Sequence, residues 1–434
     1  MTILELFRNT VFWTLDYVKG GRVRKYMSTL LSVDRGGYSP DYQRVKSEKL
    51  LRHCINTVPA YKKMSGTNLA DWPVVSKKEL RENKASHLSS LYEAENLISM
   101  STSGSTGTPF SCLQDINKKK HVNAEVIYYS GKTGYKIGQR IIYIRSLVKK
   151  VAKSPIQQFL SNIYQLNSKD LSDKGIEELF RQIKKLSSGS GAMVLSYAST
   201  LDAFRKYFEK HGFDAVKDCK IFGIISGSEM LYDVTRESME RAFGCKCFSR
   251  YSNEENGILG QDEVENNIFL TNNVSYVVEI LKFDSDEPAS VGEVGRIVVT
   301  DLYNYAMPMI RYDTGDAGAW VEVIYNGKKR LAIGNFAGRA VDIIFDCDGN
   351  QISPHMITNG MWKFEGISQF QFVQKQKNDY EMRICAGSNY DEAELLEVLH
   401  SIVGENAHIK IKKVDEIPIL SSGKRRYIVN EMLK

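Results

Sequence analysis

Apolar residues recur at intervals of three and four along much of the first half of the chain, a spacing that predicts amphipathic helices. The ranges with this spacing are 42–56, 76–86, 116–131, 201–211 and 231–243. Short runs of apolar and β-branched residues between them predict buried strands. These runs are 141–144, 192–197 and 221–225. Strands that are connected through helices of this length pair in parallel, so we predict an α/β fold for the middle of the chain.

The pattern changes after the middle of the chain. From about residue 266 to residue 335, short β-type runs alternate with turn residues, which predicts a β-rich subdomain. Further on, two short strand-like runs flank Asp348-Gly349, a pair typical of a type I′ hairpin. A helical pattern at 391–403 and a strand-like run at 408–414 follow.

These changes in pattern predict two domains. We expect a large N-terminal α/β domain over residues 1–341, which includes the β-rich subdomain. The remaining residues, 342–434, are predicted to form a small α+β lid domain. The boundary is placed near Asp342.

The first residues form an amphipathic pattern of their own. Apolar residues stand at helical spacing at Leu4, Phe7, Val11, Leu15 and Val18, and basic residues follow at Lys19, Arg22, Arg24 and Lys25. The commoner use of such a helix is to dock its apolar face on the core of its own protein, and we expect that use first. The alternative is peripheral contact with an anionic membrane surface. No stretch approaches the ~18 consecutive apolar residues of a spanning helix.

Composition excludes several classes of function. The chain has 434 residues and a net charge of +6, which is too weak for the electrostatic footprint of a nucleic-acid-binding protein. Seven cysteines, an odd number spread over a long chain, argue against a disulfide framework and for the cytoplasm. Cys245 and Cys247 form a C-x-C pair without zinc ligands at suitable spacing, so we expect buried thiols there.

One loop suggests anion binding. Between residues 101 and 109, hydroxyl side chains alternate with glycines just before a helical pattern. Such a loop turns backbone N–H groups and hydroxyls towards phosphate oxygens. A flexible Ser/Gly linker is the alternative, and the loop lacks the Gly-Lys-Ser/Thr ending of a P-loop. The candidate ligands are Thr102, Ser103, Gly104, Ser105, Thr106, Gly107 and Thr108.

Four further segments follow this loop in a fixed order. They are Gly227-Ser228-Glu229 between a predicted strand and helix, Tyr251-Ser252-Asn253-Glu254-Glu255, Arg311-Tyr312-Asp313-Thr314-Gly315-Asp316, and Gly338-Arg339-Ala340-Val341-Asp342. A basic tail, Ser421-Ser422-Gly423-Lys424-Arg425-Arg426, comes last. Together they resemble the motifs of the adenylate-forming (ANL) superfamily, and specifically its phenylacetate-CoA ligase-like branch, which includes capsular polysaccharide biosynthesis proteins of the CapK type.

The resemblance implies a role for each segment. The Ser/Gly/Thr loop, with Thr106 as a catalytic member, would close over the β and γ phosphates of ATP, and Gly227, Ser228 and Glu229 would border adenine. Tyr251 would pack on adenine, with Ser252, Asn253 and Glu254 beside the nucleotide, and Glu255 would bind Mg²⁺. Asp316 would accept hydrogen bonds from the ribose hydroxyls, and Arg339 would contact ribose or phosphate. Asp342 would be the hinge, and Lys424 would enter the site to catalyse adenylation.

The chemistry of these residues agrees with that assignment. One carboxylate together with ATP phosphates is how Mg²⁺ is usually held, and an aspartate can accept from two hydroxyls at once. Ser252 and Glu254 depart from the Gly and the hydroxyl of the family motif, and Val341 replaces an aspartate. A helix N-terminus is an alternative explanation for Ser228 and Glu229. The range 261–267 lacks Cys and His, so we expect no structural zinc.

The function implied is activation of a carboxylic acid by ATP and Mg²⁺ as an acyl-adenylate, followed by transfer to CoA. Transfer to an amine or hydroxyl of a sugar or amino acid, in surface polysaccharide biosynthesis, is an alternative. A non-catalytic nucleotide-binding scaffold is an alternative of a different class. For the acid, the candidate pocket residues are Tyr128, Tyr129, Arg145 and Ile225. We expect a cytoplasmic protein, peripheral at the inner membrane face if the N-terminal helix binds lipid, and a homodimer is a further expectation.

Overall fold

The structure is a computed structural model. It describes residues 1–36, 40–102, 110–145, 153–339, 344–349, 351–352, 354–361, 364, 366–387, 390–418 and 426–432. Several predicted site residues lie outside the described residues: Ser103, Gly104, Ser105, Thr106, Gly107, Thr108, Asp342 and Lys424.

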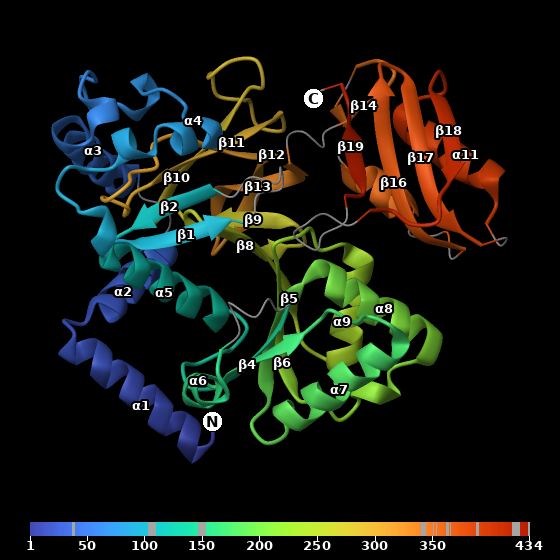
Figure 1. The fold of residues 1–434 in the computed structure, drawn as a ribbon, viewed down its shortest axis with the longest axis horizontal. Coiled ribbons are helices and arrows are strands. Elements are labelled where there is room, and N and C mark those ends of the chain that lie inside the picture. Colours follow the sequence, from blue (N-terminus) through green and yellow to red (C-terminus); the bar gives the residue numbers. More distant parts are fainter. Residues whose placement is uncertain are drawn as a thin grey trace.

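Helices cover the N-terminal part of the chain (Figure 1). They are α1 (Ile3–Val18), α2 (Arg22–Gly36), α3 (Pro40–Thr57) and α4 (Lys77–Glu82), with short 3₁₀ turns at Pro59–Tyr61, Leu69–Asp71, Lys84–His87 and Ala94–Asn96. A hairpin of β1 (Ile98–Thr102) and β2 (Phe110–Gln114) follows. This hairpin brings the two ends of the Ser/Gly/Thr loop together, because Thr102 pairs with Phe110.

An eleven-stranded sheet runs through most of the chain in the order β10-β11-β12-β13-β9-β8-β7-β6-β5-β3-β4. Its first five strands in sequence are β3 (Arg140–Arg145), β4 (Ile163–Asn167), β5 (Ala192–Tyr197), β6 (Ile221–Gly227) and β7 (Cys247–Asn253). These pair in parallel, as predicted. The helices between and beside them are α5 (Ile116–Gly131), α6 (Pro155–Ser161), α7 (Asp173–Ser187), α8 (Ala198–His211) and α9 (Asp233–Phe243), with a 3₁₀ turn at Asp214–Val216.

The other half of this sheet is antiparallel. Its strands are β8 (Gly257–Glu265), β9 (Ile268–Thr271), β10 (Tyr276–Leu281), β11 (Val294–Asp301), β12 (Tyr312–Tyr325) and β13 (Lys328–Arg339). The change of direction occurs at the turn between β7 and β8. The turn therefore lies where the parallel and antiparallel halves meet.

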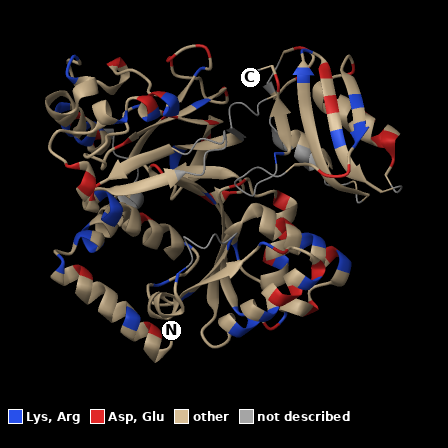
Figure 2. Cartoon of the chain, in the orientation of Figure 1, with Lys and Arg blue, Asp and Glu red and all other residues tan. Residues whose placement is uncertain are grey.

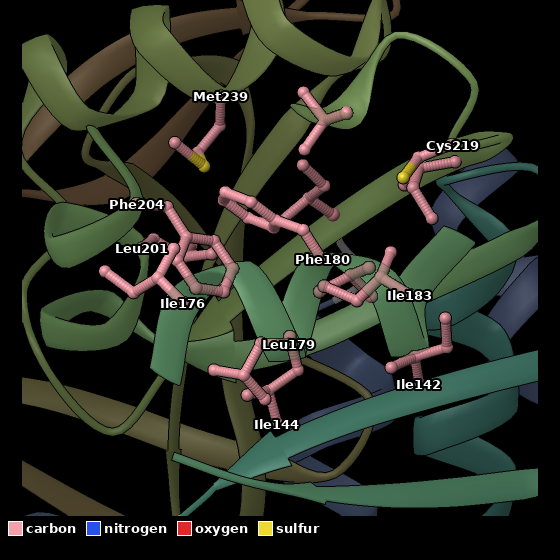
Figure 3. Packing of buried hydrophobic residues seen from close by; sticks show 14 of the residues in the cluster. Ile142, Ile144, Ile176, Leu179, Phe180, Ile183, Leu201, Phe204, Cys219 and Met239 are labelled. Carbon is pink, nitrogen blue, oxygen red and sulfur yellow. The ribbon is translucent and has the colours of Figure 1, made fainter. Parts of the chain in front are cut away.

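The parallel half is held by a dense apolar core (Figure 3). The sequence of α7 directs Ile176, Leu179, Phe180 and Ile183 to one side, and all four are buried. Phe180 packs against rings of α8, including Phe204 at 4.7 Å between ring centroids. Burial of each such side chain contributes about 1.5–3 kcal/mol, so this cluster fixes the helices that cover the sheet.

The C-terminal part contains a separate four-stranded sheet in the order β18-β17-β16-β19 (Figure 1). Its elements are β14 (Ile344–Phe345), β15 (Gln351–Ile352), α10 (Pro354–Met361), β16 (Ile367–Gln376), β17 (Asp379–Ala386), α11 (Glu392–Val403), β18 (His408–Lys413) and β19 (Ile428–Asn430). The predicted hairpin exists as β14–β15. The predicted type I′ turn is wrong, because Gly349 has a positive φ and Asp348 does not.

The docking of α1 also differs from the prediction. The helix forms where expected, with Thr2 as its N-cap. The face that docks on the protein carries the buried Glu5 and Asp16, together with Phe12 and Trp13, which are half-buried against the apolar cluster of α2 and α5. The five apolar residues that we expected to pack on the core are all exposed: Leu4, Phe7, Val11, Leu15 and Val18. Apolar spacing predicts a helix, but it does not determine which face the protein covers.

Candidate nucleotide and metal site

Glu255 lies in the turn between β7 and β8, and its side chain is only 3% exposed. One carboxylate oxygen, Oε1, accepts hydrogen bonds from Lys77 Nζ at 2.7 Å and from the Tyr312 hydroxyl at 2.9 Å. The other, Oε2, is buried and makes no hydrogen bond within the described part of the chain. A buried carboxylate oxygen without a partner is costly, and a hard cation such as Mg²⁺ prefers such a ligand. The donor therefore fits the predicted metal.

Local structure fixes the two groups that hold Glu255. Val75 pairs with the start of β12, with its amide donating to Arg311 O and its carbonyl accepting from Asp313 N, both at 3.0 Å. Ser76 then caps α4 by accepting from Glu79 N, so Lys77 is held beside Tyr312. The buried Arg311 guanidinium donates to Trp72 O at 2.7 Å, which secures the same segment.

A second cluster joins Tyr251 to the end of the 311–316 segment. The Tyr251 hydroxyl donates to Asp316 Oδ2 at 2.9 Å, and Asp316 N donates to Thr314 Oγ1 at 3.1 Å. Gly315 has a φ of 75°, a conformation that favours glycine and turns the chain between these two residues. The Tyr251 ring packs edge-on to Phe336 at 4.7 Å. The structure thus brings together two residues that are 65 positions apart in the sequence.

The pairing of β12 with β13 places Arg339. Its backbone stands opposite Asp316 across β12 and β13. The backbone of the predicted ribose ligand is therefore next to that of the predicted ribose or phosphate contact.

The Gly227–Glu229 segment leaves the end of β6, and Gly227 pairs with Arg250 of β7. Ser228 has a positive φ and is exposed. The Glu229 carboxylate accepts from Ser199 N at 2.8 Å in the first turn of α8, where a negative charge is favourable. The explanation as the start of α9 is wrong, because that helix begins only at Asp233.

The middle of the 251–255 segment forms the turn itself. Asn253 Oδ1 accepts from Asn256 N at 2.8 Å, which shapes the turn that carries Glu255. Ser252 is half-buried and Glu254 is exposed. Glu254 thus lies at the surface, whereas Glu255 points inward.

The four predicted pocket residues do not form one cluster. Tyr128 and Tyr129 pack in a cluster with residues of α2, whereas Ile225 packs in another with Met193 and Leu195. Arg145 Nη1 donates to the Tyr143 hydroxyl at 3.4 Å, with its guanidinium 5.1 Å from that ring.

Sequence reasoning missed a charged residue near these side chains. Arg250 is 9% exposed and donates from Nε to Gln261 Oε1 at 3.2 Å and from Nη2 to Ser130 Oγ at 3.4 Å, both neutral acceptors. Burial lowers the pKa of its guanidinium to about 10, and the nearby Tyr129 and Tyr143 oppose that shift. The signal in the sequence was its place directly before Tyr251, which puts it on the opposite face of β7.

Lys77 was missed as well, and no local motif marks it. Tyr312 belongs to the 311–316 motif, but its contact with Glu255 can be seen only in the folded structure. Within the described residues, no cluster of three or more His, Cys, Asp or Glu has metal-ligand geometry. Cys245 and Cys247 are free thiols, and burial is the main cause that raises the pKa of each.

Comparison with solved structures defines the class of fold. The structure resembles 2-hydroxyisobutyryl-CoA ligase in its postadenylation state, with a TM-score of 0.68 and 14% identity over 90% of this chain and 89% of that one. ATP-bound MatB from Rhodopseudomonas palustris is also similar, with a TM-score of 0.54 and 14% identity over 77% of this chain and 67% of that one. The fold is that of the adenylate-forming ligases, as predicted.

Sequence comparison is more specific. Residues 344–431 match the family model of the CapK C-terminal domain. The chain is 21% identical to Protein CapK of Staphylococcus aureus over 86% of this chain and 82% of that protein. It is 22% identical to phenylacetate-coenzyme A ligase of Pseudomonas putida over 88% and 84%, respectively. The predicted resemblance to the phenylacetate-CoA ligase-like and CapK-type family is confirmed.

Proposed function

We propose that this protein is an AMP-forming acid ligase that activates a carboxylic acid with ATP, releases pyrophosphate, and transfers the acyl group to CoA. The observation that carries the proposal is the buried Glu255 carboxylate, which has one oxygen without a hydrogen bond among the described residues. Its other oxygen accepts from Tyr312, which belongs to the same segment as Asp316, the acceptor of the Tyr251 hydroxyl. The names of its relatives, phenylacetate-coenzyme A ligase and 2-hydroxyisobutyryl-CoA ligase, support the acid and CoA as substrates.

The proposed reaction must overcome the repulsion between two anions, the acid and ATP. A carboxylate oxygen attacks the α-phosphorus, pyrophosphate leaves, and both reactants are anionic, so positive charge must be placed where negative charge develops. We assign that task to Lys424 and Lys77 from this chain. Mg²⁺, held by Glu255, would neutralise phosphate charge and polarise the phosphoryl oxygens.

The remaining site residues would bind and orient the nucleotide. Asp316 is half-buried and already accepts from one hydroxyl, that of Tyr251, which supports a role as a hydroxyl acceptor. We propose that it accepts from ribose and that Arg339 contacts ribose or phosphate. Thr106 and the rest of the 102–108 loop would hold the phosphates. A hinge at Asp342 would move the lid domain over residues 342–434 and withdraw Lys424 after adenylation.

Arg250 indicates which class of acid the protein would accept. Among the described residues the buried Arg250 guanidinium has only neutral acceptors, and such a group stabilises a nearby anion strongly. We propose that the acyl group carries a second anionic or hydrogen-bond-accepting group that faces Arg250, with Tyr129 and Tyr143 beside it. Arg250→Gln should raise the KM for such an acid about tenfold and leave the KM for ATP unchanged, whereas equal effects on both would contradict this assignment.

The acceptor has two candidates. CoA is favoured by the named CoA ligases among the relatives. An amine or hydroxyl of a sugar or amino acid, used in surface polysaccharide biosynthesis, is the second, because CapK is also among the relatives and its C-terminal domain family matches residues 344–431. We propose a cytoplasmic protein in either case. We also propose peripheral contact with the inner membrane face through α1 and, separately, a homodimer.

Pyrophosphate release tests the proposed activity. It is measured with ATP, Mg²⁺ and a panel of aryl, fatty, hydroxy and dicarboxylic acids, with and without CoA. Release should depend on one class of acid and be lost in Lys424→Ala. The matched control is Lys329→Ala, since Lys329 is an exposed lysine on β13 whose removal should have no effect. ATP binding without release for any acid would favour the nucleotide-binding scaffold.

A further inference from the structure

The helix α1 is docked in an inverted orientation. Its polar residues face the protein: Glu5 accepts from Ser190 Oγ at 2.6 Å, and Asn9 donates to Ile137 O at 2.9 Å. Asp16 accepts from the amides of Val23 and Arg24, both at 3.0 Å, which caps the start of α2. These polar contacts leave the apolar stripe of α1 in solvent.

That stripe is large. Ile3 is 88% exposed, Phe7 63% and Val18 74%, and Leu4, Val11 and Leu15 complete the same face. The neighbouring helix α6 extends it with Ile156, Phe159 and Leu160, which stand on one side of that helix and are 52–72% exposed. We call these nine residues the α1–α6 surface. A contiguous apolar patch of this kind marks an interaction site rather than ordinary surface.

The two helices are joined directly. Arg8 Nη2 donates to Phe159 O at 2.9 Å, and the guanidinium lies 5.1 Å from the centre of the Phe159 ring. Both helices lie at the edge of the molecule near the N-terminus (Figure 1). Phe159 of α6 therefore lies beside α1, so the exposed apolar residues of the two helices are neighbours.

The exposed charged residues of residues 1–25 and α6 are all basic. Residues 1–25 contain two acidic side chains, Glu5 and Asp16, and both are buried against the protein. The same range contains five basic residues: Arg8, Lys19, Arg22, Arg24 and Lys25. Helix α6 has no charged residue. The distribution of basic and acidic residues over the elements can be followed in Figure 2.

We propose that the α1–α6 surface binds the surface of an anionic lipid bilayer, with its apolar residues inserted among the headgroups and acyl chains and its basic residues against lipid phosphates. A second copy of the chain fits less well. Two such surfaces facing each other would bring basic segments together, and residues 1–25 offer no exposed acid to pair with them. This inference deepens the membrane contact proposed above and does not depend on the ligase activity.

Vesicle sedimentation of the full-length protein tests the proposal without any substrate. The protein should sediment with vesicles of phosphatidylcholine and phosphatidylglycerol, and less at high salt or with phosphatidylcholine alone. Phe7→Glu and Leu160→Glu should each reduce the bound fraction at least about tenfold. Leu91→Glu and Ile324→Glu are matched controls, because both residues are exposed apolar side chains elsewhere, and they should bind as the unchanged protein does.

Two results would overturn the proposal. One is equal sedimentation of the unchanged protein and both α1–α6 variants. The other is loss of a dimer in Phe7→Glu, measured by analytical ultracentrifugation, without vesicle binding by the unchanged protein; that result assigns the surface to a second copy. Circular dichroism checks folding, and if either variant unfolds, Lys19→Glu with Lys25→Glu provides a test that leaves the apolar residues intact. A failure here leaves pyrophosphate release unaffected, so the two proposals are tested separately.

Discussion

Two buried carboxylates in this protein each bond a lysine at 2.7 Å, yet the two pairs differ in completeness. Lys118 and Asp301 are both 0% exposed, and Lys118 also donates to the Tyr276 hydroxyl. Asp301 Oδ2 has no hydrogen bond among the described residues but forms the ion pair with Lys118 Nζ at 2.7 Å, and Asp301 Oδ1 accepts from Tyr303 N at 2.9 Å. The Lys77–Glu255 pair is more open, since the Lys77 side chain is 29% exposed and Glu255 Oε2 has no hydrogen bond among the described residues. The first pair is closed to any ligand, whereas the second has capacity for one.

The difference separates a structural pair from a functional one. Tyr276, which contacts Lys118, also donates to the carbonyl of Asn256, the residue after Glu255. The closed pair thereby supports the turn on which the open pair stands. A buried ion pair alone is weak evidence of function, but an incomplete one beside the motif for which we propose nucleotide binding is informative.

Breaking the closed pair, Lys118–Asp301, should have the largest effect, and that effect should be on the stability of the protein. Asp301→Asn leaves a buried lysine without its counter-charge, which should cost about 3–5 kcal/mol of unfolding free energy. Urea denaturation measures this loss of unfolding free energy, at the transition in which the N-terminal part of the chain unfolds. Replacing both partners, as Lys118→Met with Asp301→Leu, should recover part of the loss, and a double variant less stable than Asp301→Asn would contradict the account of the pair.

Breaking the open pair should instead affect activity. Glu255→Gln keeps the shape of the side chain but removes the charge of the proposed metal ligand. The kcat for acid-dependent pyrophosphate release should fall about 100-fold or more, with little change in thermal stability. Glu322→Gln is the control, because Glu322 is an exposed glutamate paired with Lys329. Full activity in Glu255→Gln would remove this residue from the mechanism.

The lysine of the open pair should have an intermediate effect. Lys77→Met removes a cation that we place beside the phosphates, so the KM for ATP should rise about tenfold while the dependence on the acid stays the same. Lys77→Arg should restore part of the affinity. If Lys77 only positioned Glu255, the Mg²⁺ requirement would change and the KM for ATP would not, so titration of both distinguishes the two roles.

The smallest effect concerns pH and the surroundings of the closed pair. Burial, then the charges of Lys118 and Lys46, hold the pKa of His121 well below its usual value of 6.5. The ring lies among the Ser275 hydroxyl, the Glu125 carboxylate and the rings of Tyr26 and Tyr303. It therefore stays neutral in the folded protein, whereas the unfolded chain binds a proton below pH 6.5.

The direction in which stability changes with pH follows from this difference in protonation. The unfolded state gains protons as pH falls below 6.5, so stability should fall, by about 1.4 kcal/mol per pH unit from this group alone. Urea denaturation at pH 7.5 and pH 5.5 measures the loss, and His121→Gln should reduce it by about that amount. An identical pH dependence in His121→Gln would mean that this ring titrates in the folded protein as it does in the unfolded one.

The sequence was a good guide where a pattern has one structural outcome. The range 116–131 is α5, and 192–197 is β5, because helical spacing and a short, mostly apolar run each favour one local conformation. The motifs at 251–255 and 311–316 meet as expected of one site. The sequence could not reveal Lys77, since its partner is 178 residues away and only the strand-like pairing of Val75 places it there.

The sequence also could not predict which face of a helix docks on the protein. The stripe of α1 is visible in the sequence, but the choice of its polar side for docking depends on Ser190 and on the amides of residues 23 and 24. The type I′ expectation failed for a related reason, because a turn's φ angles depend on its length as well as on an Asp-Gly pair. Five residues, 346–350, separate β14 from β15.

In the proposed reaction, the acid's carboxylate attacks the α-phosphorus of ATP. An acid labelled with ¹⁸O in its carboxylate tests this most directly, once pyrophosphate release has identified a substrate. If an acyl-adenylate forms and is then captured by the acceptor, one labelled oxygen leaves with AMP, and mass spectrometry of AMP detects it. AMP that carries one ¹⁸O, with none formed by Lys424→Ala, is the predicted result. Unlabelled AMP, or label found only in inorganic phosphate, would contradict adenylate formation.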